Sequence, residues 1–139
     1  MTSKIVYQGN LRTSATHLAS NSNIETDAPV DNNGKGEKFS PTDLVATALA
    51  SCMFTIMGML AERNNINIDG SYAEVNKIMF AEPRRIGRVE INMYVSGQES
   101  YSEKEMAMLR HAALTCPVWH SLHPEMEKVV TFYFNGQVY

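Results

Sequence analysis

Cysteine and charge are both scarce in this chain, and each scarcity excludes a class of protein. Only two cysteines, Cys52 and Cys116, occur among 139 residues, so a disulfide-rich framework is excluded. Charged residues make up 19% of the chain, the net charge is -3, and no run of lysine and arginine occurs. A nucleic-acid partner is therefore not expected, because phosphate binding needs a basic stripe.

Long apolar runs are also rare, and only residues 44–61 raise the question of a membrane. This segment is at the short limit for crossing a bilayer and contains hydroxyl side chains, so we interpret it as a buried helix and expect no membrane partner. The N-terminus lacks the charged and apolar regions of a signal peptide. We therefore expect a cytoplasmic protein, in whose reducing environment a disulfide is transient or catalytic.

Strand signals occur on both sides of the apolar segment. Residues 88–95 alternate apolar and polar side chains, as a half-buried strand does, and they follow another strand across a turn at residues 83–87. Residues 28–39 show neither the helical nor the strand periodicity of apolar residues, so they predict a loop. The length of this loop suggests a functional or interface role. The predicted strands are residues 5–7, 11–18, 24–27, 71–82, 88–95 and 129–134.

The apolar segment belongs to a long helix with a clear start. Ser40 is a good N-cap, and Asp43 completes a pattern typical of a capping box. The helix is expected to continue to about residue 63. Its apolar residues occupy nearly every face, which predicts burial on all sides, and a dimer would share that burial.

A second helix begins with the capping box Ser102-x-x-Glu105 and is expected to end at about Cys116, before Pro117. The order of elements is then β-β-β-α-β-β-α-β. This order lacks the alternation of a parallel α/β protein and predicts an α+β fold. The length suits a single domain over residues 1–139.

The two cysteines are the candidates for chemistry, and their positions alone leave two interpretations open. Cys52 lies in mid-helix and Cys116 at a helix end, both on apolar faces, as ordinary buried cysteines do. A reactive Cys52 would need a cation to lower its pKa, while Cys116 would be disfavoured as a thiolate at the negative end of a helix. The candidate cations are Arg12, Arg63, Arg84, Arg85 and Arg88.

A metal site and a Cys–His hydrolase pair are less well supported by the sequence. Cys116, His120 and His123 form C-x3-H-x2-H, which offers three soft ligands for zinc or copper. The nearby prolines interrupt a helical spacing and no fourth ligand follows, so we expect the histidines to line a turn, with no metal and no cofactor. A Cys–His hydrolase pair is also formally possible, but nothing marks an oxyanion hole.

Methionine is abundant, with nine residues, several of them on the predicted helices. Met53, Met57 and Met59 lie on the first helix, close to Cys52 in the sequence. Their simplest role is filling the core. The functional alternative is an adaptable apolar pocket beside Cys52 that accepts hydrophobic molecules.

Two segments resemble the OsmC/Ohr family of thiol peroxidases. They are SPTDLVATALASCMFTIMGMLAERNNI at residues 40–66 and LTCPVWHSL at residues 114–122. The resemblance implies an intertwined homodimer with a mixed sheet around the central helices and active sites at the dimer interface. It also implies that hydrophobic organic hydroperoxides are reduced by Cys52, that Cys116 resolves the sulfenic acid as a disulfide, and that a dithiol reductant of the lipoyl type restores both thiols.

The chain departs from the family pattern beside the first helix. Thr42 occupies the position where the characterised peroxidases carry a glutamate, and Asp43 follows it. A capping role suits Asp43 better than catalysis, because ideal helical geometry places it roughly 180° around and about 13 Å from Cys52. Arg12 is the candidate for the arginine with which the family stabilises the thiolate.

Thr42 also favours an alternative of a different class. Without the family glutamate, the chain could be a non-catalytic OsmC-like module that holds a small apolar ligand in a pocket at the dimer interface. A disulfide between Cys52 and Cys116 after peroxide treatment would distinguish the enzyme from this binding module.

Overall fold

The computed structural model describes residues 1–139, which divide into two compact units, Met1–Val45 and Ala46–Tyr139. The elements confirm the predicted α+β class, the strand–helix order and the mixed sheet. Two short elements were not predicted, the 3-10 turn η1 (Val30–Asn32) and the strand β7 (Gln137–Val138). A turn or short helical segment was expected over residues 120–127, and the helix α3 (Pro117–Ser121) begins three residues earlier. The single domain over residues 1–139 stays a prediction.

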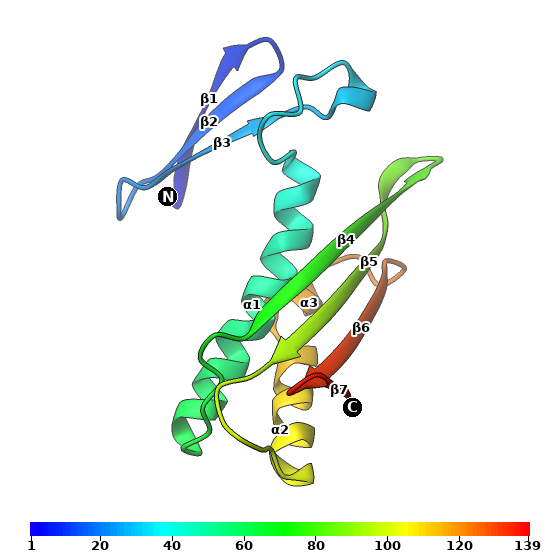
Figure 1. Ribbon diagram of the computed structural model, residues 1–139. Coiled ribbons are helices and arrows are strands. Elements are labelled where there is room, and N and C mark those ends of the chain that lie inside the picture. Colours follow the sequence, from blue (N-terminus) through cyan, green and yellow to red (C-terminus); the bar gives the residue numbers. More distant parts are fainter. The chain divides into compact units, whose positions relative to one another are not determined.

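The first unit contains an antiparallel sheet with the order β1-β2-β3 (Figure 1). This sheet has no apolar core of its own. Ile5, Tyr7 and Ile24 are 61%, 65% and 53% exposed, whereas the buried side chains of the unit belong to Thr26, Asp27 and Ser40. A sheet this apolar and this exposed is typical of a surface that another layer covers. Its strands are β1 (Ser3–Gly9), β2 (Arg12–His17) and β3 (Asn23–Asp27).

The long helix α1 (Pro41–Arg63) begins as predicted. Ser40 Oγ accepts the backbone N–H of Asp43 at 3.0 Å, and Asp43 Oδ2 accepts that of Ser40 at 2.8 Å. By length and composition this helix could cross a membrane, as core helices of soluble proteins also could. In this chain it buries one face rather than all faces, through Ala46, Leu49, Ala50, Met53, Met57 and Ala61.

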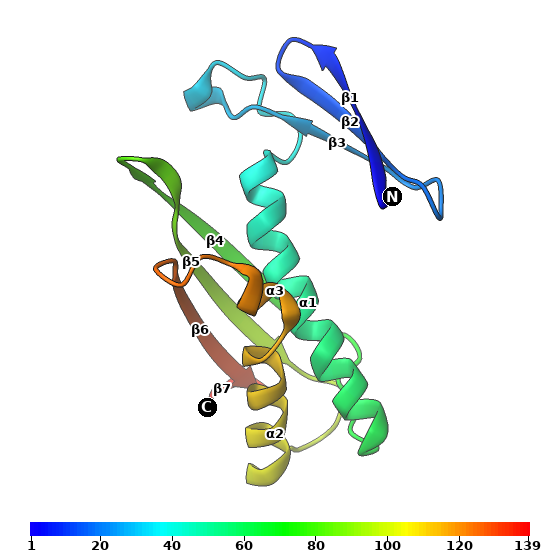
Figure 2. The same ribbon diagram turned by 180° about the vertical axis from the view of Figure 1, so that it is seen from behind.

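The second unit contains a mixed sheet with the order β4-β5-β6-β7, in which β5 and β6 are parallel and the other pairs antiparallel. Strand β5 confirms the predicted alternation, because Val89, Ile91, Met93 and Val95 are all buried. The helices of this unit lie together on one face of this sheet (Figure 2). The strands are β4 (Tyr72–Ala81), β5 (Arg84–Val95), β6 (Glu127–Phe134) and β7 (Gln137–Val138).

The turn between β4 and β5 is tighter than predicted. Residues 83–87 were expected to form it, but β5 already begins at Arg84. Gly87 lies in a bulge of the strand, where the register shifts after Ile78. A Cβ atom at position 87 would overlap the Phe80 ring, so this glycine allows close packing rather than a turn.

The second long helix, α2 (Glu103–Leu114), has the predicted capping box between Ser102 and Glu105. It ends before Cys116, which instead opens α3 (Pro117–Ser121). The chain then returns to the sheet as β6 and turns into β7 through Asn135 and Gly136, whose φ angles of 49° and 83° suit a tight hairpin.

Candidate active site

Cys116 is positioned by the break between α2 and α3. Thr115 caps the end of α2, and Pro117 occupies the first position of α3, where its fixed φ angle suits a helix start. Cys116 is the N-cap of α3, and its Sγ atom accepts the backbone N–H of Trp119 at 3.4 Å. Its side chain is completely buried.

This position corrects a prediction. Cys116 was expected to end the second helix, where the negative end of the helix dipole would disfavour a thiolate. It lies instead at the start of α3, and a backbone donor reaches its sulfur. The Cys116-Pro117 pair was the sequence signal for a new helix. Proline is favoured at the first position of a helix, and the residue before it, here Cys116, is then the N-cap.

Cys52 lies on α1 and is only partly buried. The predicted neighbours on its face include Val45 and Met59, which are 37% and 51% exposed. The expectation of an apolar face is therefore correct, but this chain leaves much of that face open to solvent. Access to Cys52 is thus greater than access to Cys116.

The two thiols are free and lie close enough to each other to interact. Burial raises the pKa of Cys116, the N–H of Trp119 partly opposes that rise, and the interaction with Cys52 adds to it. Cys116 therefore stays a thiol at neutral pH. The sequence left open whether the two cysteines are within reach of one another, and the fold brings them into contact.

Arg12, on β2, lies in a cluster of charges within the first unit. Its Nε atom donates to Asp27 Oδ1 at 2.7 Å, and its Nη2 atom donates to Asp27 Oδ2 and Glu37 Oε2, both at 2.8 Å. These hydrogen bonds raise the pKa of Arg12 and lower that of the buried Asp27. The guanidinium is thus held in a fixed orientation and always charged.

Asp27 and Glu37 are functional candidates that the sequence analysis missed. Glu37 comes from the loop at residues 28–39, whose length was the available signal. Its backbone N–H also donates to Asp27 Oδ2 at 3.2 Å, so this loop and Arg12 share one buried carboxylate. The pairing of Asp27 with Arg12 across neighbouring strands depends on the β2–β3 register, which the sequence did not specify.

Asp43 and Thr42 both lie in the first turn of α1. Asp43 makes the reciprocal capping bonds with Ser40, and the hydroxyls of Ser40 and Thr42 lie 3.1 Å apart. The capping role that the sequence favoured for Asp43 is therefore present. A catalytic role for Asp43 stays a prediction.

Two of the other candidate arginines, Arg88 and Arg85, are engaged elsewhere in the second unit. Arg88 forms an ion pair with Glu90 at 2.8 Å. Arg85 lies over the ring of Phe80, 5.6 Å from its centroid. Arg63 lies in the last turn of α1 and lines a groove.

This groove lies between α1 and α2 and has a volume of about 460 Å³. Ile56 and Met59 line it, one and two turns after Cys52 on α1, and so does Thr115, the neighbour of Cys116. Met53 and Met57 are instead fully buried in the core. Of the three methionines only Met59 lines this groove, and a substrate pocket beside Cys52 stays a prediction.

The two histidines after Cys116 take part in local structure. His123 Nδ1 accepts the backbone N–H of Glu125 at 3.2 Å, and His120 lies in the last turn of α3. Nowhere do three His, Cys, Asp or Glu side chains gather in a way that could hold a metal ion.

The fold and the two neighbouring thiols define a small α+β protein with one partly exposed and one buried cysteine near an apolar groove. Residues 34–129 match the profile of the OsmC-like proteins, and the chain belongs to this family. No curated protein matches it.

Among solved structures, a protein of Psychrobacter arcticus 273-4, provisionally described as an osmotic stress induced and detoxification response protein, is 52% identical, with a TM-score of 0.91 over 96% of both chains. Two others share the fold at low identity. The organic hydroperoxide resistance protein OsmC of Legionella pneumophila is 14% identical, with a TM-score of 0.69 over 94% of this chain and 93% of its own. OhrB of Bacillus subtilis, also an organic hydroperoxide resistance protein, is 17% identical, with a TM-score of 0.61 over 96% and 98%.

Proposed function

We propose that the protein is a cytoplasmic cysteine-based peroxidase that reduces organic hydroperoxides. The observation that carries the proposal is the contact between two unlike thiols, the partly exposed Cys52 and the completely buried Cys116. The exposed thiol is suited to meet a substrate. The buried one, kept protonated by its surroundings, is suited to wait for the oxidised product of the first.

In the first step, the thiolate of Cys52 attacks one oxygen of the hydroperoxide. The S–O bond forms as the O–O bond breaks, and the leaving alkoxide takes up a proton and departs as an alcohol. Cys52 is oxidised by two electrons to a sulfenic acid, and the peroxide is reduced by the same two.

In the second step, the sulfur of Cys116 attacks the sulfur of Cys52. The S–S bond forms, the S–O bond breaks, and the departing hydroxide takes the proton of Cys116 and leaves as water. A dithiol reductant of the lipoyl type then restores both thiols by two exchange reactions and becomes a disulfide itself. The existing contact between the thiols supports this step, because it brings the two sulfurs together before oxidation.

The proposal includes a homodimer. Two surfaces of the chain support it: the face of α1 that carries Cys52 and Met59, and the sheet β1-β2-β3 with its exposed Ile5 and Tyr7. Apolar surfaces of this kind are rarely left open on a monomer. A second copy of the chain would cover them and would restrict the access of water to Cys52.

Arg12 is the proposed cation for the Cys52 thiolate. Its charge is permanent, and Asp27 orients its guanidinium through two hydrogen bonds. An acid beside the arginine is therefore present although Thr42 replaces the family glutamate. Replacing Arg12 with lysine keeps a charge but loses the bidentate pair, so we expect the peroxidatic rate to fall while the disulfide can still form.

The groove between α1 and α2 is the proposed site for the organic part of the peroxide. Its walls at Ile56, Met59 and Leu60 are apolar, and the thioether of Met59 can adapt to substrates of different shape. Such a lining favours hydrophobic hydroperoxides over hydrogen peroxide.

Turnover tests the proposal directly. The purified protein should consume cumene hydroperoxide with dihydrolipoamide as reductant, and Cys52→Ser should abolish this reaction while circular dichroism shows an intact fold. Cys116→Ser should allow a single reduction of peroxide per chain but no further turnover with the dithiol. Equal inactivity of the wild type and Cys52→Ser would refute the proposal.

The second candidate function is an OsmC-like module that holds a small apolar ligand without reacting with it. Thr42 favours it, because the hydroxyl supplies no charge where the characterised peroxidases have a carboxylate, and the groove supplies a place for the ligand. Under this alternative, both thiols would remain unmodified after exposure to hydroperoxide.

A further inference from the structure

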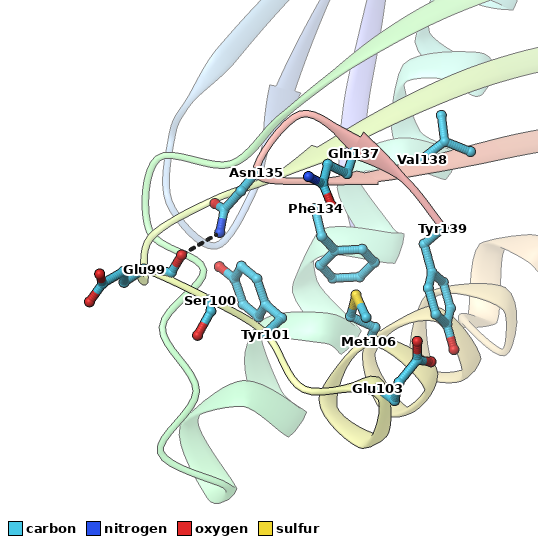
Figure 3. A pocket seen from close by; sticks show the side chains of 10 residues that line it. All are labelled: Glu99, Ser100, Tyr101, Glu103, Met106, Phe134, Asn135, Gln137, Val138 and Tyr139. Atoms are coloured by element: carbon cyan, nitrogen blue, oxygen red, sulfur yellow. Dashed lines mark hydrogen bonds between the residues drawn. The ribbon is translucent and has the colours of Figure 1, made fainter.

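A second cavity lies in the Ala46–Tyr139 unit and has no part in the chemistry of the thiols. It opens between the loop after β5, the first turns of α2 and the β6–β7 hairpin (Figure 3). Its volume is about 410 Å³, within the range of sites for small molecules. Its chemical lining differs from that of the groove beside the cysteines.

Three aromatic rings line the cavity. The centroid of Phe134 lies 5.3 Å from that of Tyr101 and 5.6 Å from that of Tyr139, with ring planes inclined by 62° and 85°. Neighbouring rings therefore meet edge to face rather than in a parallel stack. The thioether of Met106 lies among them (Figure 3).

The hydroxyl of Tyr101 already has a hydrogen-bond partner in the protein. The Tyr101 hydroxyl donates to the backbone oxygen of Asn67 at 2.7 Å, outside the lining of the cavity. Phe134 is buried in the core and has no polar atom. Tyr101 therefore offers a ligand its ring, whose face carries partial negative charge, while the buried Phe134 packs against Tyr101 and Tyr139 from behind the cavity surface.

The charged residues of the lining are both acidic. Glu99 and Glu103 are its only charged members, and neither carboxylate forms an ion pair with another side chain. The capping box of α2 is completed by Ser102 and Glu105, so Glu103 is not needed to satisfy the start of the helix. An anion would be repelled here, whereas a cation would find both carboxylates and aromatic rings.

The walls are held in place before any ligand binds. Asn135, in the β6–β7 turn, donates through Nδ2 to the backbone oxygens of Gln98 at 3.2 Å and Glu99 at 3.1 Å. Gln98 in turn accepts the backbone N–H of Asn67 at 2.9 Å. These bonds tie the loop to the hairpin, and a preformed cavity avoids the cost of ordering its walls on binding.

We propose that this cavity is a binding site for a small organic cation of the quaternary ammonium class, held by the rings of Tyr101 and Tyr139 and by the carboxylates of Glu99 and Glu103. Ring faces attract such cations, and the carboxylates add a Coulombic attraction. An uncharged molecule of the same shape would fill the cavity while leaving both carboxylates without a partner.

Choline and its uncharged isostere 3,3-dimethylbutan-1-ol distinguish these cases, because the two differ in charge but hardly in shape. Calorimetric titration of the full chain with choline chloride, against sodium chloride of equal ionic strength, should show saturable binding. The isostere should bind at least about tenfold more weakly.

Two variants locate the binding. Glu103→Gln and Tyr139→Leu should each weaken choline binding by about tenfold, while Glu125→Gln, an exposed acid outside the cavity, should leave it unchanged. Circular dichroism of each variant checks the fold, and peroxide turnover should be unaffected in all three. Absence of saturable choline binding, equal binding of the isostere, or binding that survives both substitutions in the cavity would overturn the proposal.

Discussion

The backbone N–H of Trp119 donates to the sulfur of Cys116, so the only tryptophan of the chain is tied to the buried thiol of the candidate site. The indole ring of Trp119 also lies beneath the ammonium group of Lys128, whose nitrogen is 5.4 Å from the ring centroid. The start of α3 is therefore linked to the state of Cys116.

Trp119 should report the oxidation of the thiols. When Cys116 bonds to Cys52, its sulfur is drawn toward α1 and its hydrogen bond to Trp119 is altered, which changes the surroundings of the indole. We expect tryptophan fluorescence to change after one equivalent of cumene hydroperoxide and to recover with dithiothreitol. Cys116→Ser is the control, because it can form a sulfenic acid but no intramolecular disulfide, and its fluorescence should stay constant.

The two thiols should differ strongly in alkylation. Burial raises the pKa of Cys116 and shields it from reagents, whereas Cys52 is partly exposed. In the reduced native protein at pH 7, iodoacetamide should label Cys52 alone, as measured by peptide mass spectrometry. Cys116 should react only after denaturation. Equal labelling of both thiols in the native protein would contradict this asymmetry.

The pairing of Asp27 with Arg12 predicts how stability depends on pH. The pKa of Asp27 is lower in the folded protein than in the unfolded chain, because Arg12 stabilises the carboxylate. Its contribution is therefore complete above the unfolded carboxyl pKa of about 3.9 and is lost as the pH falls through the lower folded value. Asp27→Asn should reduce the urea midpoint at pH 7 and flatten its fall toward pH 3.

Glu25→Gln provides the matched control for Asp27. Glu25 lies on the same strand but pairs with Lys38 at the surface, at 3.2 Å. Exposed pairs of this kind contribute little to stability, so the free energy of unfolding should change by no more than about 0.5 kcal/mol at pH 7. A similar effect of both substitutions would show that the Arg12 pair has no special importance.

Substitutions at the start of α1 distinguish the capping role from the catalytic role of Asp43. If its role is capping, Asp43→Ala and Ser40→Ala should each lower the free energy of unfolding by about 1 kcal/mol and leave the turnover of the folded protein intact. Ser102→Ala, at the cap of α2, should have a similar cost. Loss of turnover in Asp43→Ala without loss of stability would instead assign it to catalysis.

The sequence predicted those elements whose signals are local. Both capping boxes and the alternation of β5 depend on residues a few positions apart, and all three are present. Gly87 was misread because its reason for being glycine, the Phe80 ring, lies on another strand. The strand β7 was missed although Asn135-Gly136 is a strong hairpin signal, because the segment after it is very short.

The site was predictable only in part, for the same reason. The motifs around Cys52 and Cys116 identified both cysteines, but their contact depends on how α1 packs against the α2–α3 break. Likewise, Arg12 was a candidate from its position, whereas its partners Asp27 and Glu37 come from a strand register and a loop conformation. Pairwise contacts between distant segments are set by packing, which no local pattern encodes.

If Cys52 and Cys116 act as attacking and resolving thiols, peroxide must join them in a disulfide, which intact-mass spectrometry detects. The reduced protein is mixed with one equivalent of cumene hydroperoxide, quenched with an alkylating reagent in denaturant so that every free thiol reacts, and weighed. This mechanism predicts a chain lighter by two hydrogen atoms, with no alkylated thiol and a linked peptide pair containing Cys52 and Cys116, and no such product in Cys52→Ser. Two alkylated thiols in the treated wild type would contradict it.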